Sequence, residues 1–200
     1  MSRTEALQQQ KEHLRQHFLA RRRELDELEA RRASAEVCQR LGNLSALKDV
    51  RRLAGYAARG AEVGVRSFLQ QAQRRGTQIV LPRVTGPGRM EFCLVNDWDE
   101  LVPGAFGIEE PKGQAVETST IEAFLVPGVA FDVQGARLGF GMGYYDRALP
   151  TVGKALAIGV CHHCQIADAG LPTESHDRPM DMIVTDEMTQ LVSDQNGEAH

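Results

Sequence analysis

The sequence has no long uninterrupted apolar segment. Its longest apolar stretch, residues 123–130, is broken by Pro127 and Gly128, whereas a membrane-spanning helix needs roughly 18 or more consecutive apolar residues. The N-terminus also lacks the apolar core of a signal peptide. We therefore expect a cytoplasmic protein without a membrane partner.

Cysteine is scarce, and basic residues are not in excess. Four cysteines in 200 residues are typical of free thiols rather than of a disulfide framework. The net charge of -4 gives no global reason to expect nucleic-acid binding. The segment Cys161-His162-His163-Cys164 cannot close one tetrahedral zinc site with four consecutive residues, and a C-x-x-C redox pair is weakly indicated. The pattern favours a structural segment there.

An apolar content of 42% and a charged content of 25% are ordinary for a globular protein. We predict a single α/β domain over residues 1–193 and a disordered polar tail over 194–200. The domain includes an N-terminal helical arm, 3–41, which contains no Gly or Pro and is rich in good helix formers.

From residue 50 onward, the sequence contains several short apolar segments, and one amphipathic segment lies between the first two. A helix over 63–75 between two strands is a βαβ pattern, which favours a parallel sheet covered by helices. The turn at 85–88 predicts a hairpin. The loop-rich stretch 100–119 is long enough to be a functional loop. The predicted strands are residues 50–58, 77–82, 90–95, 123–126, 155–160 and 182–185.

Three glycines at alternate positions, Gly139, Gly141 and Gly143, stand between an apolar run and a helix-like segment over 143–149. This spacing would let backbone N–H groups approach a polyphosphate, with a helix N-terminus behind them. The pattern is neither a Walker A loop nor G-x-G-x-x-G. A tight turn that needs glycine for its backbone angles is the alternative.

Charged residues flank these glycines. Arg137 and Arg147 suit bidentate binding of phosphate, or they are surface residues. Asp132 and Asp146 could hold Mg²⁺ or cap a turn. A second acidic segment, 174–181, could meet the glycine loop at the carboxyl ends of the strands, or it is a solvated connector.

In these residues the chain resembles the 5-formyltetrahydrofolate cyclo-ligase family, also called methenyltetrahydrofolate synthetases. The most specific block is Phe131-Asp132, Arg137-Leu138-Gly139 and Gly141-x-Gly143-Tyr144-Tyr145-Asp146-Arg147. Other matches follow in family order, namely Lys11-x-x-Leu14-Arg15, Glu62-Val63, Gly107-Ile108-x-Glu110-Pro111, Cys164-Gln165 and Pro172-x-Glu174-x-His176-Asp177-x-Pro179-Met180-Asp181.

The resemblance implies a three-layer α/β/α fold with a mixed, largely parallel sheet and a long N-terminal helix. It also implies that ATP and Mg²⁺ convert 5-formyltetrahydrofolate, with or without a polyglutamate tail, to 5,10-methenyltetrahydrofolate. We expect a monomer. A non-catalytic nucleotide- or folate-binding module on the same fold, and a sugar-phosphate enzyme of similar architecture, are the alternatives.

Roles follow from the resemblance, position by position. The implied catalytic residues are Arg137 and Tyr145, and the implied Mg²⁺ ligands are Asp146 and Asp177. The implied substrate-binding residues are Glu62, Phe106, Phe140 and Tyr144. The implied ATP-binding residues are Lys11, Arg15, Arg137, Leu138, Gly139, Phe140, Gly141, Met142, Gly143, Tyr144 and Tyr145. Phe140 and Met142 depart from family members that carry Arg or Lys there.

Overall fold

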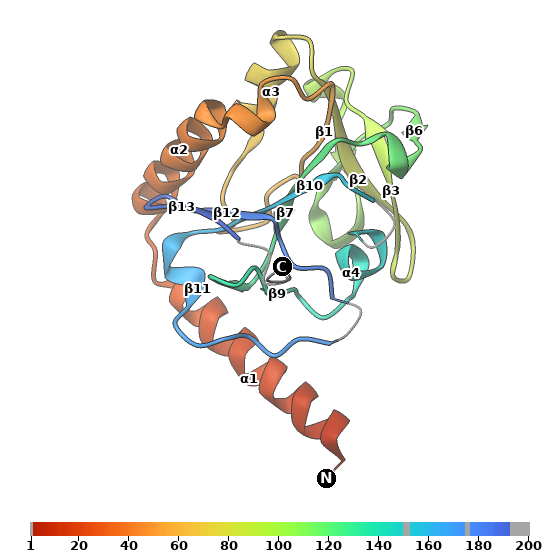
Figure 1. The fold of residues 1–200 in the computed structure, drawn as a ribbon. Coiled ribbons are helices and arrows are strands. Elements are labelled where there is room, and N and C mark those ends of the chain that lie inside the picture. Colours follow the sequence, from red (N-terminus) through yellow and green to blue (C-terminus); the bar gives the residue numbers. More distant parts are fainter. Residues whose placement is uncertain (1, 150–152, 175–176, 193–200) are drawn as a thin grey trace, which may run out of the picture.

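The computed structural model describes residues 2–149, 153–174 and 177–192 (Figure 1). Within these ranges the centre is an eight-stranded sheet with the order β13-β12-β10-β7-β1-β2-β3-β6. The strands are β1 (Arg52–Ala54), β2 (Gln78–Gly86), β3 (Arg89–Leu94), β6 (Ala115–Val116), β7 (Ala123–Pro127), β10 (Leu156–Val160), β12 (Met182–Val184) and β13 (Thr189–Leu191). The predicted tail, 194–200, lies outside the described residues.

The sheet is mixed and largely parallel, as predicted. The central strands β12, β10, β7, β1 and β2 run parallel to one another. The strands at the two edges, β13 on one side and β3 with β6 on the other, pair antiparallel. The β2–β3 pair is the hairpin expected from the turn at 85–88. This arrangement confirms the α/β fold class.

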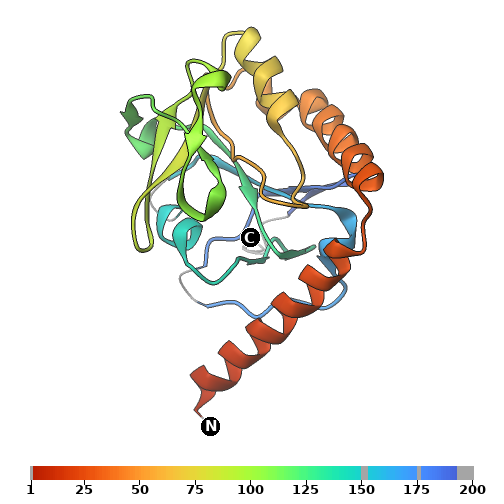
Figure 2. The ribbon, with the colours of Figure 1, turned by 180° about the vertical axis from the view of Figure 1, so that it is seen from behind.

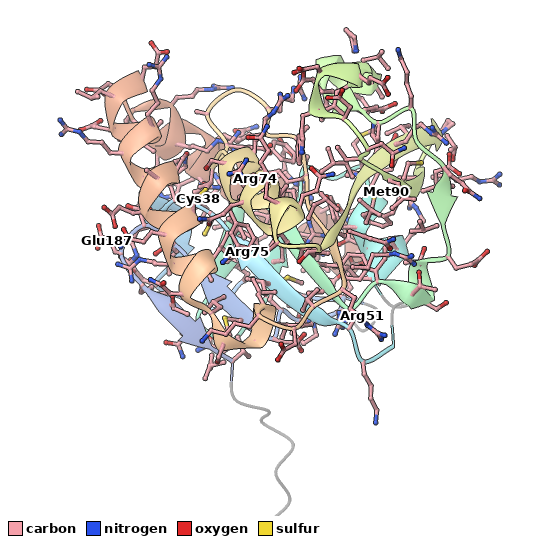
Figure 3. The ribbon with its side chains drawn as sticks, turned by 90° about the horizontal axis from the view of Figure 1, so that it is seen from above. Cys38, Arg51, Arg74, Arg75, Met90 and Glu187 are labelled. Atoms are coloured by element: carbon pink, nitrogen blue, oxygen red, sulfur yellow. The ribbon has the colours of Figure 1, made fainter. Side chains whose placement is uncertain are left out.

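Both faces of the sheet are buried, which explains why the central strands are apolar without alternation. Leu53, Ile79 and Leu125 pack on one face, under α2 (Glu27–Asn43) and α3 (Arg66–Arg74). Figure 3 shows these two helices side by side over the sheet, with Cys38 of α2 next to α3. Ala54 and Phe124 pack on the opposite face.

The layer on that opposite face is built from short elements. It contains α4 (Tyr144–Ala148), whose Tyr145 and Ala148 pack against the buried cluster of this face. A small three-stranded sheet of β8 (Ala130–Asp132), β9 (Arg137–Leu138) and β11 (Ile166–Ala167) lies beside it. The glycine segment connects β9 to α4, so the small sheet positions this segment.

The N-terminal arm consists of two helices, and the expectation of one continuous helix over 3–41 is wrong. Three residues separate α1 (Arg3–Arg23) from α2, because Asp26 caps α2 in a capping box with Glu29. In Figures 1 and 2, α1 passes below the central sheet and its N-terminal end extends away from the molecule. The break therefore turns α1 toward the segments that follow the strands.

The other differences between the predicted elements and the structure are local. The strand expected over 50–58 ends at Ala54, because the chain leaves the sheet there. The predicted loop over 100–119 contains a hairpin of β4 (Val102–Pro103) and β5 (Glu109–Glu110), as well as β6. β13 is polar and short, so no apolar pattern in the sequence predicted it. No helix of the described chain is long and apolar enough to cross a membrane.

Replacing Asp26 with Ala removes the side-chain acceptor of the capping box at the start of α2. We expect the melting temperature to fall by about 2 to 4 °C, the effect of a lost N-cap in a chain of this size. Asp26→Ser keeps an acceptor and should retain the wild-type value. An unchanged melting temperature in Asp26→Ala would show that the cap contributes nothing to folding.

Candidate active site

A cleft of about 940 Å³, partly open to solvent, lies where β1, β2 and β7 end. The strand order reverses between β1 and β7, since β2 follows β1 on one side and β7 pairs with it on the other. Open α/β sheets bind ligands at such a reversal, beyond the carboxyl ends of the strands. We call this the apolar cleft. Its lining includes Tyr56, Glu62, Met90, Phe106, Ile108, Phe140, Tyr144 and Tyr145.

Glu62 is fixed in the segment that follows β1. The Tyr56 hydroxyl donates to the Val63 carbonyl at 2.8 Å, and the Arg59 backbone N–H donates to Glu62 Oε2 at 2.8 Å. Burial raises the pKa of the Glu62 carboxyl, while the Arg59 N–H and the charge of Arg22 oppose that rise. The residue expected to bind substrate therefore holds a largely buried carboxylate at the cleft.

The glycine loop, residues 139–143, forms one wall of the apolar cleft. Gly141 and Gly143 have φ of +87° and +67°, which only glycine adopts without strain, and a Cβ on Gly143 would lie 2.8 Å from Arg147 Nη1. Arg15 Nε donates to the Gly139 carbonyl at 2.9 Å, and Arg147 Nη2 donates to the Met142 carbonyl at 2.6 Å. Two arginines thus fix the backbone of the loop.

The helix after the glycine loop is shorter than predicted. α4 has five residues, too few for the helix N-terminus expected behind the loop to add much charge. Any anion binding at the loop must therefore come from its backbone N–H groups and from nearby cationic side chains.

Arg137 and Asp146 form an ion pair at the centre of the site. The Arg137 side chain is 6% exposed, and its guanidinium lies 5.5 Å from the centre of the Tyr145 ring. Both residues of the pair line the apolar cleft and also a second cleft of about 830 Å³. The pair therefore marks the boundary between two neighbouring compartments.

The second compartment, here called the polar cleft, is lined mainly by polar side chains. They come from the small sheet and its β8–β9 loop, from α4 and from the C-terminal segment, and include Asp132, Gln134, Arg137, Asp146, Thr173, Glu174, Asp177 and Arg178. The acidic segment that the sequence placed near the glycine loop does meet the loop's neighbours here. Ser175 and His176 of that segment lie outside the described residues.

One face of α1 carries cations toward these clefts. Lys11, Arg15, Phe18 and Arg22 follow one another at spacings of four, three and four, so they share a helical face. Lys11 Nζ lies 2.7 Å from Glu174 Oε2 and 3.6 Å from Asp177 Oδ2. Sequence reasoning named Lys11 and Arg15 but missed Arg22, although continuing the same spacing by one turn would have found it.

The loop around Phe106 forms another wall of the apolar cleft. Phe106 has φ of +59°, an unfavourable backbone angle for a bulky residue, and the residue is 47% exposed. Its ring meets Tyr144 edge to face, with 6.2 Å between centroids. The Glu110 carboxylate accepts the N–H groups of Val84 and Ala105 and fixes this loop to β2.

Of the two aspartates that the sequence left open between metal binding and capping, Asp132 is a cap. Its Oδ1 accepts the N–H groups of Gln134 and Ala136, at 3.0 and 2.9 Å. Its Oδ2 accepts the Leu171 N–H at 2.7 Å. The carboxylate is buried and holds two loops of the polar cleft together.

The predicted Mg²⁺ ligands, Asp146 and Asp177, both line the polar cleft. Among the described residues, no group of three or more His, Cys, Asp or Glu side chains could hold a metal ion. Mg²⁺ commonly binds one or two carboxylates and takes its other oxygens from substrate phosphates and water. Two carboxylates would be sufficient for a metal that arrives with a phosphate ligand.

A cleft at the reversal of an open parallel sheet, with an apolar and a polar compartment, defines the chain as a small-molecule-binding α/β protein. The family model described as the 5-formyltetrahydrofolate cyclo-ligase family matches residues 7–186. The chain belongs to this family.

Individual proteins similar to this chain support the same family. A 5-formyltetrahydrofolate cyclo-ligase of Mycolicibacterium smegmatis is 33% identical, over 88% of this chain and 93% of the relative. The corresponding protein of Saccharomyces cerevisiae is 32% identical, over 76% and 83%. The solved 5,10-methenyltetrahydrofolate synthetase of Aquifex aeolicus superposes with a TM-score of 0.83 at 36% identity, covering 95% and 96% of the two chains. The predicted family and enzyme class, a ligase, are confirmed.

Removing the Asp132 carboxylate should destabilise the fold, because this carboxylate connects two loops of the polar cleft. We expect Asp132→Ala to lower the free energy of unfolding by at least about 3 kcal/mol, since three buried N–H groups lose a charged acceptor. Asp132→Asn keeps one acceptor oxygen and should lie between Asp132→Ala and wild type. Urea denaturation measures the order, and equal stability of Asp132→Ala and wild type would contradict it.

Proposed function

We propose that the protein converts 5-formyltetrahydrofolate to 5,10-methenyltetrahydrofolate with ATP and Mg²⁺, and releases ADP and phosphate. Membership of the cyclo-ligase family supports the reaction class. The observation that carries the proposal is the pair of compartments that meet at Arg137 and Asp146. A reaction between a flat heterocyclic substrate and a polyphosphate needs one apolar and one polar site with a shared boundary.

The apolar cleft takes the folate. Its aromatic and aliphatic lining, which includes the edge-to-face pair of Phe106 and Tyr144, suits a flat heterocycle. Glu62 supplies a carboxylate for the N–H donors of the pterin ring. Phe140 completes the wall on the side of the glycine loop.

ATP lies along the glycine loop, with its phosphates toward the polar cleft. Lys11 and Arg15 supply positive charge from α1, Arg137 supplies it at the boundary, and residues 138–145 wrap the nucleotide. Mg²⁺ held by Asp146 and Asp177 would neutralise phosphate charge and orient the γ-phosphate. In the free protein Arg137 and Lys11 neutralise these same two carboxylates.

The chemistry needs positioning more than it needs a strong base. The formyl oxygen attacks the γ-phosphorus of ATP, the bond to the β–γ bridging oxygen breaks, and ADP leaves. The formyl carbon, now attached to a phosphorylated oxygen, is electrophilic. N10 therefore attacks this carbon and loses its proton, and the bond between the carbon and the phosphorylated oxygen breaks to release phosphate. Arg137 lies at the boundary of the clefts, where charge develops on the transferring group.

Tyr145 lines the apolar cleft next to this boundary. Its ring packs beside the Arg137 guanidinium, and within the described structure its buried hydroxyl has no hydrogen-bond partner. Burial raises the pKa of Tyr145 far above its usual value. The group therefore stays protonated and can donate to an oxygen of the reacting formyl or phosphoryl group.

The direct test is ATP-dependent formation of the methenyl product, followed by its near-ultraviolet absorbance with (6S)-5-formyltetrahydrofolate, ATP and Mg²⁺. We expect absorbance to grow only when all three are present. Binding of both ligands by calorimetry without turnover would instead identify a non-catalytic binding module. Absence of folate binding would contradict the proposed reaction, and binding of ATP alone would leave only a nucleotide-binding module.

Asp146→Asn tests the polar cleft. The amide removes the negative charge that pairs with Arg137 and would bind the metal, so we expect kcat/KM to fall by about 100-fold or more, a loss of roughly 2.7 kcal/mol of transition-state stabilisation. Asp168→Asn, at an exposed position outside both clefts, is the matched control and should behave as wild type. A fully active Asp146→Asn enzyme would refute the metal assignment.

Tyr145→Phe separates stability from catalysis. The buried hydroxyl has no partner, so its removal should leave the melting temperature equal to or higher than that of wild type. If the hydroxyl donates to the reacting group, kcat falls by about tenfold or more while the KM for folate changes little. An unchanged kcat in a stable Tyr145→Phe protein would exclude the donor role.

A further inference from the structure

Arg22, near the C-terminal end of α1, is buried at a position where a charged side chain lowers the stability of the fold. The residue is 8% exposed. Its Nη1 is shielded from solvent and has no hydrogen-bond partner in the described part of the chain. The nearest acidic atom is Glu62 Oε1 at 3.9 Å, beyond hydrogen-bond distance. A buried guanidinium that is only loosely paired is destabilising, so stability does not explain its place.

The surroundings of Arg22 connect it to the apolar cleft. Its guanidinium carbon lies 5.7 Å from the centre of the Phe140 ring, within the range of a cation–π contact. Phe140 and Glu62 both line the cleft, whereas Arg22 does not. Arg22 therefore lies behind two of the side chains that face the ligand. A cation at position 140 would repel Arg22, which gives a physical reason for an aromatic residue there.

We propose that Arg22 is a positioning residue, which keeps the Glu62 carboxylate ionised and directed into the apolar cleft so that it can hold the substrate's paired N–H donors. This inference rests on the proposed function. A pterin presents its 2-amino group and ring N–H side by side, and two carboxylate oxygens match that pair. A protonated Glu62 would offer a donor in place of one acceptor and would lose the match.

The other titratable groups around the pair do not change charge near neutral pH. Burial raises the pKa values of Tyr56, Tyr145 and Cys164, so these groups stay neutral. Burial lowers the pKa of His162, so it is neutral as well.

Arg23 carries a fixed charge near Arg22, and Arg59 carries one near Glu62. Glu62 is then the group that titrates, and its raised pKa means that its charge is lost as pH falls. Removal of Arg22 should raise that pKa further.

The first experiment measures the ionisation of Glu62 in the free protein. The side-chain carboxyl ¹³C resonance of Glu62, assigned with Glu62→Gln, is titrated by NMR in wild type, Arg22→Met and Arg22→Lys. We expect Arg22→Met to raise the pKa of Glu62 by about one unit, a tenfold change in its ionisation. Arg22→Lys keeps a cation and should shift less. Arg23→Met, an exposed neighbour in the same helical turn, is the control and should leave it unchanged.

The second experiment measures the affinity for (6S)-5-formyltetrahydrofolate by calorimetry between pH 6 and 8.5. Arg22→Met should weaken binding most at the lowest pH, by up to about tenfold, and the loss should shrink as pH rises and Glu62 ionises. The KM for ATP should not change. In the Glu62→Gln background, Arg22→Met should add no further pH-dependent loss, because the two residues act through one carboxylate.

The outcomes separate the two proposals. An unchanged Glu62 titration in folded Arg22→Met, or in Arg22→Lys if the Met variant does not fold, overturns the role of Arg22. The same follows from an affinity loss that is equal at every pH. The Glu62 titration could change in the Arg22 variants while the wild-type protein neither binds nor converts the folate. That result would support the effect of Arg22 on Glu62 and would refute the proposed function.

Discussion

The docking of α1 through charged side chains is the contact on which both clefts depend. Lys11 and Arg22 are nearly as buried as Phe18 on the same helical face. Buried ion pairs gain little net stability over apolar residues of similar size, so an apolar face would hold this helix at least as well. The cations therefore indicate a role beyond folding. Through them α1 reaches the acidic segment at Glu174 and the carboxylate of Glu62.

Arginine side chains also hold the remaining parts of the site in place. Arg15 and Arg147 hold the glycine loop by its carbonyl groups, which leaves the N–H groups of that loop for other partners. Arg137 is paired with Asp146 at the junction of the clefts. Before any ligand is present, the protein thus balances its cations with the carboxylates proposed to bind metal and substrate. The ligands would exchange these internal pairs for external ones, at little cost in buried charge.

Sequence patterns predicted the layout of the fold well, because each central strand is a short apolar run bounded by turn residues. They did not predict the break between α1 and α2. That break is made by the capping pair Asp26 and Glu29, in a stretch without Gly or Pro. The resemblance supplied most of the site residues, yet it could not show which aspartate is structural. The three N–H groups on Asp132 come from loops on either side of the polar cleft.

The sequence by itself determined the fold class, the family and the glycine positions of the loop, since these follow from local apolar patterns and from motifs within a few residues. Only the tertiary structure decided what each charged side chain faces. Arg22 and Glu62 are 40 residues apart, and Lys11 and Glu174 are 163 apart. Electrostatic interactions and burial act through space, so the partner of a charge is set only when the sheet and α1 come together.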